Sequence, residues 1–577
     1  MMEDDKGKEV KGLTRRQALK TSGLALGGLA VGGVLIGAEM AKADGVACSD
    51  ESCQECCPPG PVCYWKSVGR AQQYSYFNSL PPFHPFDFSD TNTTKIAKLD
   101  PAEMRISFMG SIFPPPRKAQ QLMSIFVEVG WDDSISQPLD NFVFDCGSGV
   151  VANYGAMNVG LGRMDKVFIT HLHGDHMSDL THIYDFGPSG DRKSPLYVWG
   201  PGRSGLMYRD PRTSTSYPEY RDGTADFCLA LRQANRWHTE SFSFQNTSYS
   251  TWVDPIAGGT WIVPNYPSDS LMSGQPSAVV DTAVNGASVP DPHGDAFALV
   301  PIELDWTKYG DVPGDNVAYK NTKTGVIITH FPVIHCREGS IGYKLEWWQT
   351  PSDTGDETKP HLTMIFTGDT KVESNCVNQA INNGQGVDVL IHETIVPAQV
   401  YAMKSAYSDD IQKFPIDSPG VQQITTVQNS SHSPQGAFGY FLSQISPRPR
   451  LTVATHFPVA DDTVSCAMKS VREHFTKEVV YQGNQPPPGA KNPVRITWSF
   501  DLMVINVTQH KIVEQKAEVS DFGFTPVINY PAGYAKNANP PKYDNSNGTP
   551  NPYAQIDTTR QLPDCTGSTC NYRDDGY

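Results

Sequence analysis

Four side chains that can bind a metal ion lie close together in the chain: His171, His173, Asp175 and His176. They follow the apolar run 165–170, which predicts a strand. Because side chains two residues apart on an extended chain point to the same side, His171 and His173 can bind one ion, while Asp175 and His176 face a second. Imidazole and carboxylate ligands together suit zinc, manganese or iron. The alternative is a polar loop whose histidines only make hydrogen bonds.

The chain around this cluster predicts the strands that must position it. Runs typical of strands lie at 105–110, 124–129, 141–145 and 165–170, and again at 325–329, 364–367, 387–391 and 451–455. Residues 434–445 are apolar at helical spacing, and residues 502–518 predict a late hairpin. Strands that alternate with helices favour an α/β domain.

The run from Thr170 to His176 resembles the signature of the metallo-β-lactamase fold, an αββα sandwich with its site at the strand ends. Further motifs of that family follow in order over about 104–460. They are Asp145 in Phe-Asp-Cys-Gly, His335 in Phe-Pro-Val-Ile-His, Asp369 in Phe-Thr-Gly-Asp-Thr, His392-Glu393-Thr394, His432 in Ser-His-Ser, and His456 after a strand. The ordered set is similar to the ribonuclease Z and arylsulfatase branch of the superfamily.

This resemblance implies a centre of two divalent metal ions, zinc or else manganese or iron. It assigns His171, His173 and His335 to the first ion, Asp175, His176 and His456 to the second, and Asp369 to a bridge between them. A carboxylate can span two ions about 3.5–4 Å apart, and a water that they share becomes hydroxide near neutral pH. In this scheme Asp175 also accepts a proton from that water. His432 donates a proton to the leaving group or binds the oxyanion, while Asp145 orients the metal-binding loop.

Each assignment has a plainer alternative. His330 competes with His335, which the trailing Gly342-Tyr343 favours. Asp369 could cap a turn, His456 could be a core histidine, and His432 could be the flank of a helix. We expect His392 and Glu393 to orient ligands rather than to take part in the chemistry.

The first 43 residues resemble a twin-arginine export signal. Arg15-Arg16 precede the uncharged stretch 21–38, and Ala41-Lys42-Ala43 is a small-x-small cleavage motif. A single membrane anchor is the alternative for this stretch. The resemblance implies a periplasmic or secreted protein that the twin-arginine machinery exports.

Cysteines and composition divide the rest of the chain. We expect a Cys/Pro-rich cap at 44–100, a metallo-β-lactamase-like domain at 101–475 with an irregular insertion at about 205–320, a C-terminal strand extension at 476–535 and an extended tail at 536–577. Seven of the 12 cysteines lie in the cap and the tail, where they predict disulfides, or in the cap a small zinc site. These are Cys48, Cys53, Cys56, Cys57, Cys63, Cys565 and Cys570.

The formal net charge of -16 disfavours a nucleic-acid substrate, because an acidic protein repels polyanions. We therefore expect a hydrolase of a small ester, with a phosphodiester or a sulfate ester favoured by the resemblance alone. A lactonase and a non-catalytic metal-binding protein are the alternatives. A diiron redox enzyme is disfavoured, because that branch is expected to carry glutamate at the position of His173. The sequence leaves open whether the chain forms a homodimer.

Overall fold

The computed structural model describes residues 74–85, 96–207, 219–238, 299–474, 479–481 and 494–519, apart from residues 189, 193, 236, 237, 407 and 409. The predicted export signal, the cysteines of the cap and those of the tail lie outside these residues. Within the described ranges, no helix has both the length and the apolar character needed to cross a bilayer.

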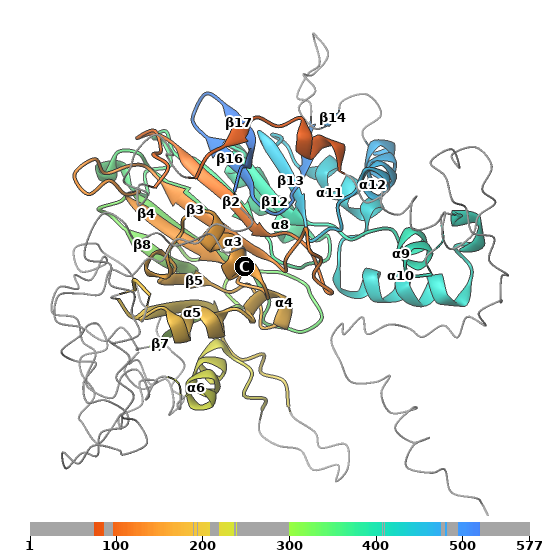
Figure 1. Cartoon of the computed structure of the whole chain (residues 1–577), viewed down its shortest axis with the longest axis horizontal. Helices are drawn as coiled ribbons and strands as arrows, with labels where there is room; N and C mark the ends of the chain where they lie inside the picture. The colour runs from red at the N-terminus through yellow and green to blue at the C-terminus, as the bar shows by residue number, and fades with distance from the viewer. Residues whose placement is uncertain are drawn as a thin grey trace, which may run out of the picture.

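Two large sheets form the body of the protein (Figure 1). The first sheet has nine strands in the order β1-β17-β16-β2-β3-β4-β5-β6-β7. Their bounds are β1 Pro82–Phe83, β2 Met104–Gly110, β3 Ser124–Val129, β4 Asp140–Phe144, β5 Lys166–Phe168, β6 Leu196–Pro201, β7 Leu299–Leu304, β16 Met503–Val507 and β17 Ile512–Ala517. From β4 to β7 the strands run parallel.

The second sheet has eight strands in the order β14-β15-β13-β12-β11-β10-β9-β8. Their bounds are β8 Val317–Asn321, β9 Val326–Pro332, β10 Ile341–Trp347, β11 Leu362–Phe366, β12 Val389–Glu393, β13 Leu451–Thr455, β14 Val479–Tyr481 and β15 Val494–Trp498. Strands β11, β12, β13 and β15 run parallel, so the carboxyl ends of the first three meet at one edge.

Helices cover the outer faces of the sheets, and the largest apolar core lies between them. Side chains of both sheets, such as Phe144 and Phe168 with Tyr343 and Phe366, pack in one buried cluster. A second cluster packs helices α3, α5 and α6 against the first sheet. The α-helices among the described residues are α3 Val150–Ala156, α4 Gly174–Met177, α5 Leu180–Phe186, α6 Thr224–Ala234, α8 Ser374–Ile381, α9 Ala398–Ser405, α10 Pro419–Ser431, α11 Gln435–Gln444 and α12 Asp461–Glu473. The predicted αββα sandwich is confirmed.

The described parts of the segment 205–320 contain more regular structure than its composition predicts. It holds helix α6, and strands β7 and β8 extend one edge of each sheet. Every residue of β7, Leu-Val-Pro-Ile-Glu-Leu, is buried. A short strand that is buried on both faces lacks the alternation of polar and apolar residues from which strands are recognised, and this one also contains a proline.

The C-terminal strands complete the sandwich. β16 and β17 form the predicted hairpin, and β16 pairs with β2 in the first sheet. β14 and β15 extend the second sheet beside β13. The described cysteines are free thiols, of which three are buried. They are Cys146, Cys228, Cys336, Cys376 and Cys466.

Candidate metal centre

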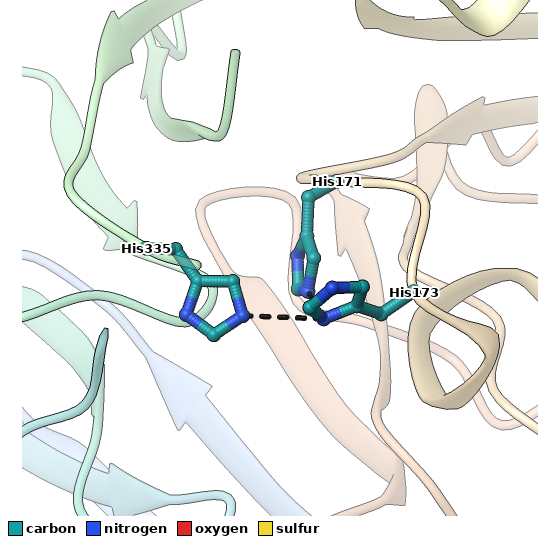
Figure 2. Close-up of side chains that lie close together, drawn as sticks. All are labelled: His171, His173 and His335. Atoms are coloured by element: carbon teal, nitrogen blue, oxygen red, sulfur yellow. Dashed lines mark hydrogen bonds between the residues drawn. The ribbon is translucent and has the colours of Figure 1, made fainter. Parts of the chain in front are cut away.

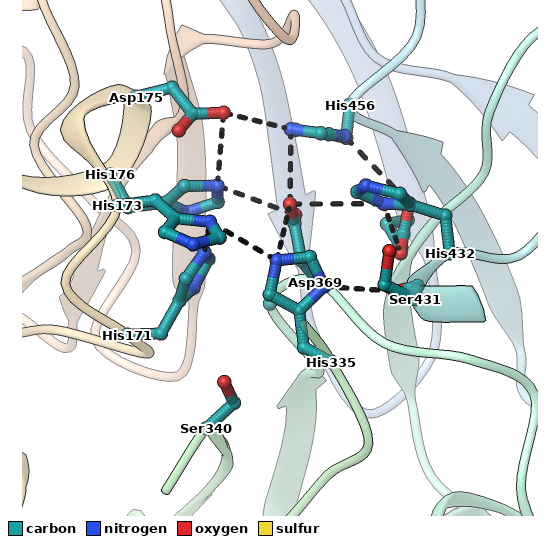
Figure 3. Close-up of polar contacts among 12 residues, drawn as sticks. His171, His173, Asp175, His176, His335, Ser340, Asp369, Ser431, His432 and His456 are labelled. Carbon is teal, nitrogen blue, oxygen red and sulfur yellow. Dashed lines mark hydrogen bonds and ion pairs between the residues drawn. The ribbon is translucent and has the colours of Figure 1, made fainter. Parts of the chain in front are cut away.

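The predicted site residues follow strand ends that meet at one edge of the sandwich (Figure 3). The histidine loop follows β5 and continues into the short helix α4. In the second sheet, His335 follows β9, Asp369 follows β11 and His456 follows β13. His432 lies between helices α10 and α11. The centre is therefore assembled from both sheets.

His171, His173 and His335 converge through their ring nitrogens (Figure 2). Nδ1 of His173 lies 3.0 Å from Nε2 of His171 and 3.2 Å from Nε2 of His335. A tetrahedral zinc ion with ligands at about 2.0–2.1 Å holds any two of them about 3.3–3.4 Å apart. Three imidazole nitrogens at this spacing fit one divalent ion.

Asp175, His176, Asp369 and His456 form a second group beside the first. Nε2 of His456 lies 3.4 Å from Oδ2 of Asp175 and 3.4 Å from Oδ2 of Asp369. Nε2 of His176 lies 3.6 Å from Oδ2 of Asp175 and 3.4 Å from Oδ1 of Asp369. The Nε2 atom of His176 is buried and makes no hydrogen bond within the described part of the chain. A buried nitrogen without a partner is costly, and a metal ion would satisfy it.

Asp369 joins the two groups. Besides its contacts with His176 and His456, its Oδ2 lies 3.9 Å from Nε2 of His335. Figure 3 shows this carboxylate between the ligand candidates of both groups. A carboxylate in this position can contact two ions at once, which is the role that the resemblance implies for it.

The Nδ1 atoms of His176 and His335 contact acceptors outside the two ligand groups. Nδ1 of His176 lies 2.7 Å from Oδ2 of Asp145, which also accepts a hydrogen bond from the backbone of Thr170 through Oδ1. Nδ1 of His335 donates to the backbone carbonyl of Ser431 at 2.8 Å. Such contacts fix the tautomer and leave the opposite nitrogen free for a metal. Asp145 thus orients the histidine loop as predicted.

Charges in the centre suit cation binding. Burial holds the pKa of His171 well below its usual range and lowers that of His335 to about 3, so these two rings are neutral, whereas Asp369, Asp175 and Asp145 outweigh burial and raise the pKa of His176 well above its usual range. Burial alone would raise the pKa of Asp369. The neighbouring His456 and His176 outweigh burial and hold that pKa well below its usual range.

Glu393 and His432 lie next to the metal ligand candidates. Nδ1 of His432 lies 2.9 Å and 3.0 Å from the two carboxylate oxygens of Glu393, and Oε1 also accepts from the backbone of Thr370. Nδ1 of His456 lies 3.7 Å from Oε2 of Glu393. Burial lowers the pKa of His432, but Glu393, Asp369 and Asp175 together outweigh burial and raise this pKa to about 9. The His432 ring therefore carries a proton on both nitrogens at neutral pH.

The structure brings all seven predicted ligands together, and their binding of metal stays a prediction. The structure also distinguishes the two members of each of two histidine-containing pairs whose roles the sequence left open. His330 is buried within β9, where burial lowers its pKa to about 4, while His335 reaches the centre. His392 packs against Phe438 and Phe441, away from the centre, so only its neighbour Glu393 has the expected orienting position.

Sequence reasoning missed the aromatic side of the centre. The ring of Phe113 lies 5.6 Å from that of His456 and 6.3 Å from that of Tyr401 in α9. The signal available in the sequence was a single aromatic residue in an otherwise Pro-rich loop between two strands. Phe113 packs against the His456 ring and restricts its orientation.

Comparison with known proteins finds a shared segment around the histidine loop. The family model of the metallo-beta-lactamase superfamily matches residues 137–196. Ribonuclease BN of Proteus mirabilis is 30% identical over 98 residues, 17% of this chain and 30% of that protein. Ribonuclease Z of Natronomonas pharaonis is 28% identical over 127 residues, 21% of this chain and 38% of that protein. The matches thus span well under half of these relatives.

Among solved structures, the metallo-beta-lactamase fold protein YhfI from Bacillus subtilis covers 70% of this chain and 100% of its own, with 13% identity and a TM-score of 0.35. The sequence similarity to the metallo-beta-lactamase superfamily rests on residues 137–196, and the two packed sheets with helices on both outer faces give the chain the metallo-β-lactamase fold.

Proposed function

We propose that this protein is a hydrolase that cleaves a small phosphodiester with the help of two divalent metal ions. The position of Asp369 between two groups of ligand candidates carries the proposal. Ions bound there would polarise the scissile centre and lower the pKa of a water to near neutrality. A sulfate ester is the second candidate, and a lactone the third.

The chain itself supplies proton transfer and orientation. Asp175, at the edge of the second group, is placed to accept the proton of the attacking water. His432 contacts Glu393 through Nδ1, which leaves its Nε2 to donate a proton to the leaving alcohol. Glu393 keeps the His432 ring in place, so the pair forms the acid side of the site.

The choice of a phosphodiester rests on the relatives and on charge. The curated relatives with shared segments include ribonucleases Z, which favours a phosphodiester bond. The net charge of -16 opposes a long polyanion such as RNA, so we propose a small substrate. We also propose that Arg15-Arg16 and the uncharged stretch after them direct export to the periplasm or beyond by the twin-arginine machinery.

A metal analysis combined with a panel of esters tests this function. The purified protein should contain close to two divalent ions per chain and should hydrolyse bis-p-nitrophenyl phosphate. Turnover of p-nitrophenyl sulfate or of a lactone alone would replace the phosphodiester by that substrate class. A protein that binds metal without any turnover would be a metal-binding protein, and one that binds none would contradict the proposal.

A further inference from the structure

The first group of ligand candidates crosses the seam between the two sheets. His171 and His173 belong to the loop after β5 in the first sheet, whereas His335 belongs to the loop after β9 in the second. Nδ1 of His173 and Nε2 of His335 lie only 3.2 Å apart across this seam (Figure 2). The affinity of this group for an ion therefore depends on how firmly the two loops are held together.

The loop that carries His335 is short and closed on itself. The backbone N–H of Val333 donates to the carbonyl of Ser340, and the N–H of Ile341 crosses the seam to the carbonyl of Thr170 at 3.0 Å. The side chain of Arg337, two residues after His335, is 41% exposed and points to other partners than the centre. Those partners belong to the segment after β6.

The side chain of Arg337 contacts two residues of the segment that is attached to the first sheet. Its Nη2 lies 2.6 Å from Oδ2 of Asp222, and its guanidinium lies 4.4 Å from the centre of the Tyr220 ring. Both partners precede helix α6 in the segment that the sequence identifies as an insertion. One side chain thus combines an ion pair with a cation–π contact, each of which is modest by itself at a half-exposed position.

The segment that contacts Arg337 is itself held by hydrogen bonds and an ion pair. Asp222 accepts hydrogen bonds from the backbone and the hydroxyl of Ser204 at 3.1 and 2.7 Å. Arg203 holds both carboxylate oxygens of Asp226 at 2.6 and 2.9 Å. Its backbone carbonyl accepts from Nε1 of Trp306 at 2.8 Å. Asp222 is therefore a fixed partner rather than a mobile surface group.

The same segment is attached to the first sheet at the start of α6. The N–H of Ala225 donates to Oε1 of Glu303 in β7 at 2.9 Å, and the hydroxyl of Thr224 donates to the carbonyl of Pro201 at the end of β6. A contact from Arg337 to Asp222 is therefore a contact from the His335 loop to the first sheet.

We propose that Arg337 is a positioning residue for the first metal group, and that Asp222 and Tyr220 of the insertion are its anchor. The insertion then helps to position the metal centre through Tyr220 and Asp222. The inference rests on the proposed metal centre but not on its substrate. Loss of the Arg337 contacts should weaken the binding of an ion at the first group. The affinity of the second group for its ion should stay nearly unchanged, because Arg337 does not connect that group to the His335 loop.

The chain offers a matched control for this test. Nη1 of Arg450 lies 2.6 Å from Oδ1 of Asp388, with side-chain exposures of 33% and 14%, against 41% and 17% for Arg337 and Asp222. R337Q and R450Q therefore remove ion pairs of equal length and similar burial. Only R337Q removes one that crosses the seam beside His335.

The experiment is a titration of metal-free full-length protein with Zn²⁺ in competition with a chromophoric chelator. We expect R337Q to weaken one of the two binding steps about threefold to tenfold, R337K to weaken it less, and R450Q to match the wild type within twofold. D222N should resemble R337Q, and the double variant should be no worse than either single one, because both remove the same contact. Thermal unfolding with EDTA checks that every variant folds.

Three results decide the question. Equal zinc affinity of R337Q and the wild type would overturn the role of Arg337 while the proposed function stands. An equal loss in R337Q and R450Q would show general destabilisation and would also overturn it. A wild type that binds none of Zn²⁺, Mn²⁺ and Fe²⁺ would refute the proposed function, and the inference would fall with it.

Discussion

Both carboxylate oxygens of Glu393 lie within hydrogen-bonding distance of Nδ1 of His432, at 2.9 and 3.0 Å. Glutamine at position 393 keeps the shape of the side chain and removes the largest of the charges that raise the pKa of His432 to about 9. We expect E393Q to lower kcat about 10- to 100-fold, in line with the loss of an orienting partner.

The pH dependence of E393Q gives a sharper check. Without the carboxylate the His432 imidazolium loses its proton at lower pH, so the variant should lose more activity at pH 8 than at pH 6. Measuring kcat against pH with bis-p-nitrophenyl phosphate tests this. A parallel profile for variant and wild type would mean that His432 is not the proton donor.

Asp369 should decide the number of bound ions. D369N keeps the size of the side chain but removes the charge that both groups share. We expect metal content to fall from close to two ions per chain towards one, and kcat/KM to fall about 1000-fold or more, because the bridge between the groups is lost. The control is D133N at an exposed aspartate that pairs with Lys98 on the surface. Full metal content in D369N would contradict the bridging role.

His335 and His330 give opposite expectations although they lie close in sequence. H335Q should lose the first ion, since its Nε2 faces His173. H330L should keep both ions, because His330 is buried within β9 and an apolar side chain suits that place. Metal content by mass spectrometry separates the two variants. Loss of metal in H330L with an unchanged melting temperature would contradict this assignment.

Asp501 should make stability fall as the pH rises. Burial raises its pKa from 3.8 to about 8, although Gln121, Ser111 and Asn153 donate hydrogen bonds to it. The folded chain then holds a proton that the unfolded chain has released. The stability from this group is complete below about pH 4 and is lost as the pH rises towards 8.

The variant D501N removes this titration. With EDTA present, its melting temperature should change less between pH 5 and pH 8 than that of the wild type, whereas D133N should follow the wild type. Circular dichroism at several pH values measures the difference. Identical slopes for D501N and the wild type would show that Asp501 does not bind the proton.

Local sequence was sufficient to predict the histidine loop and the strand before it, because four ligand candidates follow that strand within a few residues. It was not sufficient for His392 and Glu393. Neighbouring residues on a strand point to opposite faces, so only one of them can reach the centre. The sequence does not show which face of β12 is covered by α11, and the packing of His392 on Phe438 supplies that answer.

The insertion was the least predictable part. Strand β7 is buried along its whole length, and only its pairing with β6 shows that it belongs to the first sheet. The contact of Arg337 with Asp222 joins residues over a hundred positions apart, on two elements whose proximity no local pattern encodes. Tertiary pairing determines these features, and no local sequence pattern encodes them.

The pairing of β16 with β2 has a consequence for biosynthesis. The strand at Met503–Val507 lies between β2 and β17, so the first sheet cannot close until the ribosome has passed these codons. Every predicted ligand, from His171 to His456, is translated earlier. A messenger truncated before codon 503 would therefore yield a chain with all seven ligands and no finished sheet to hold them.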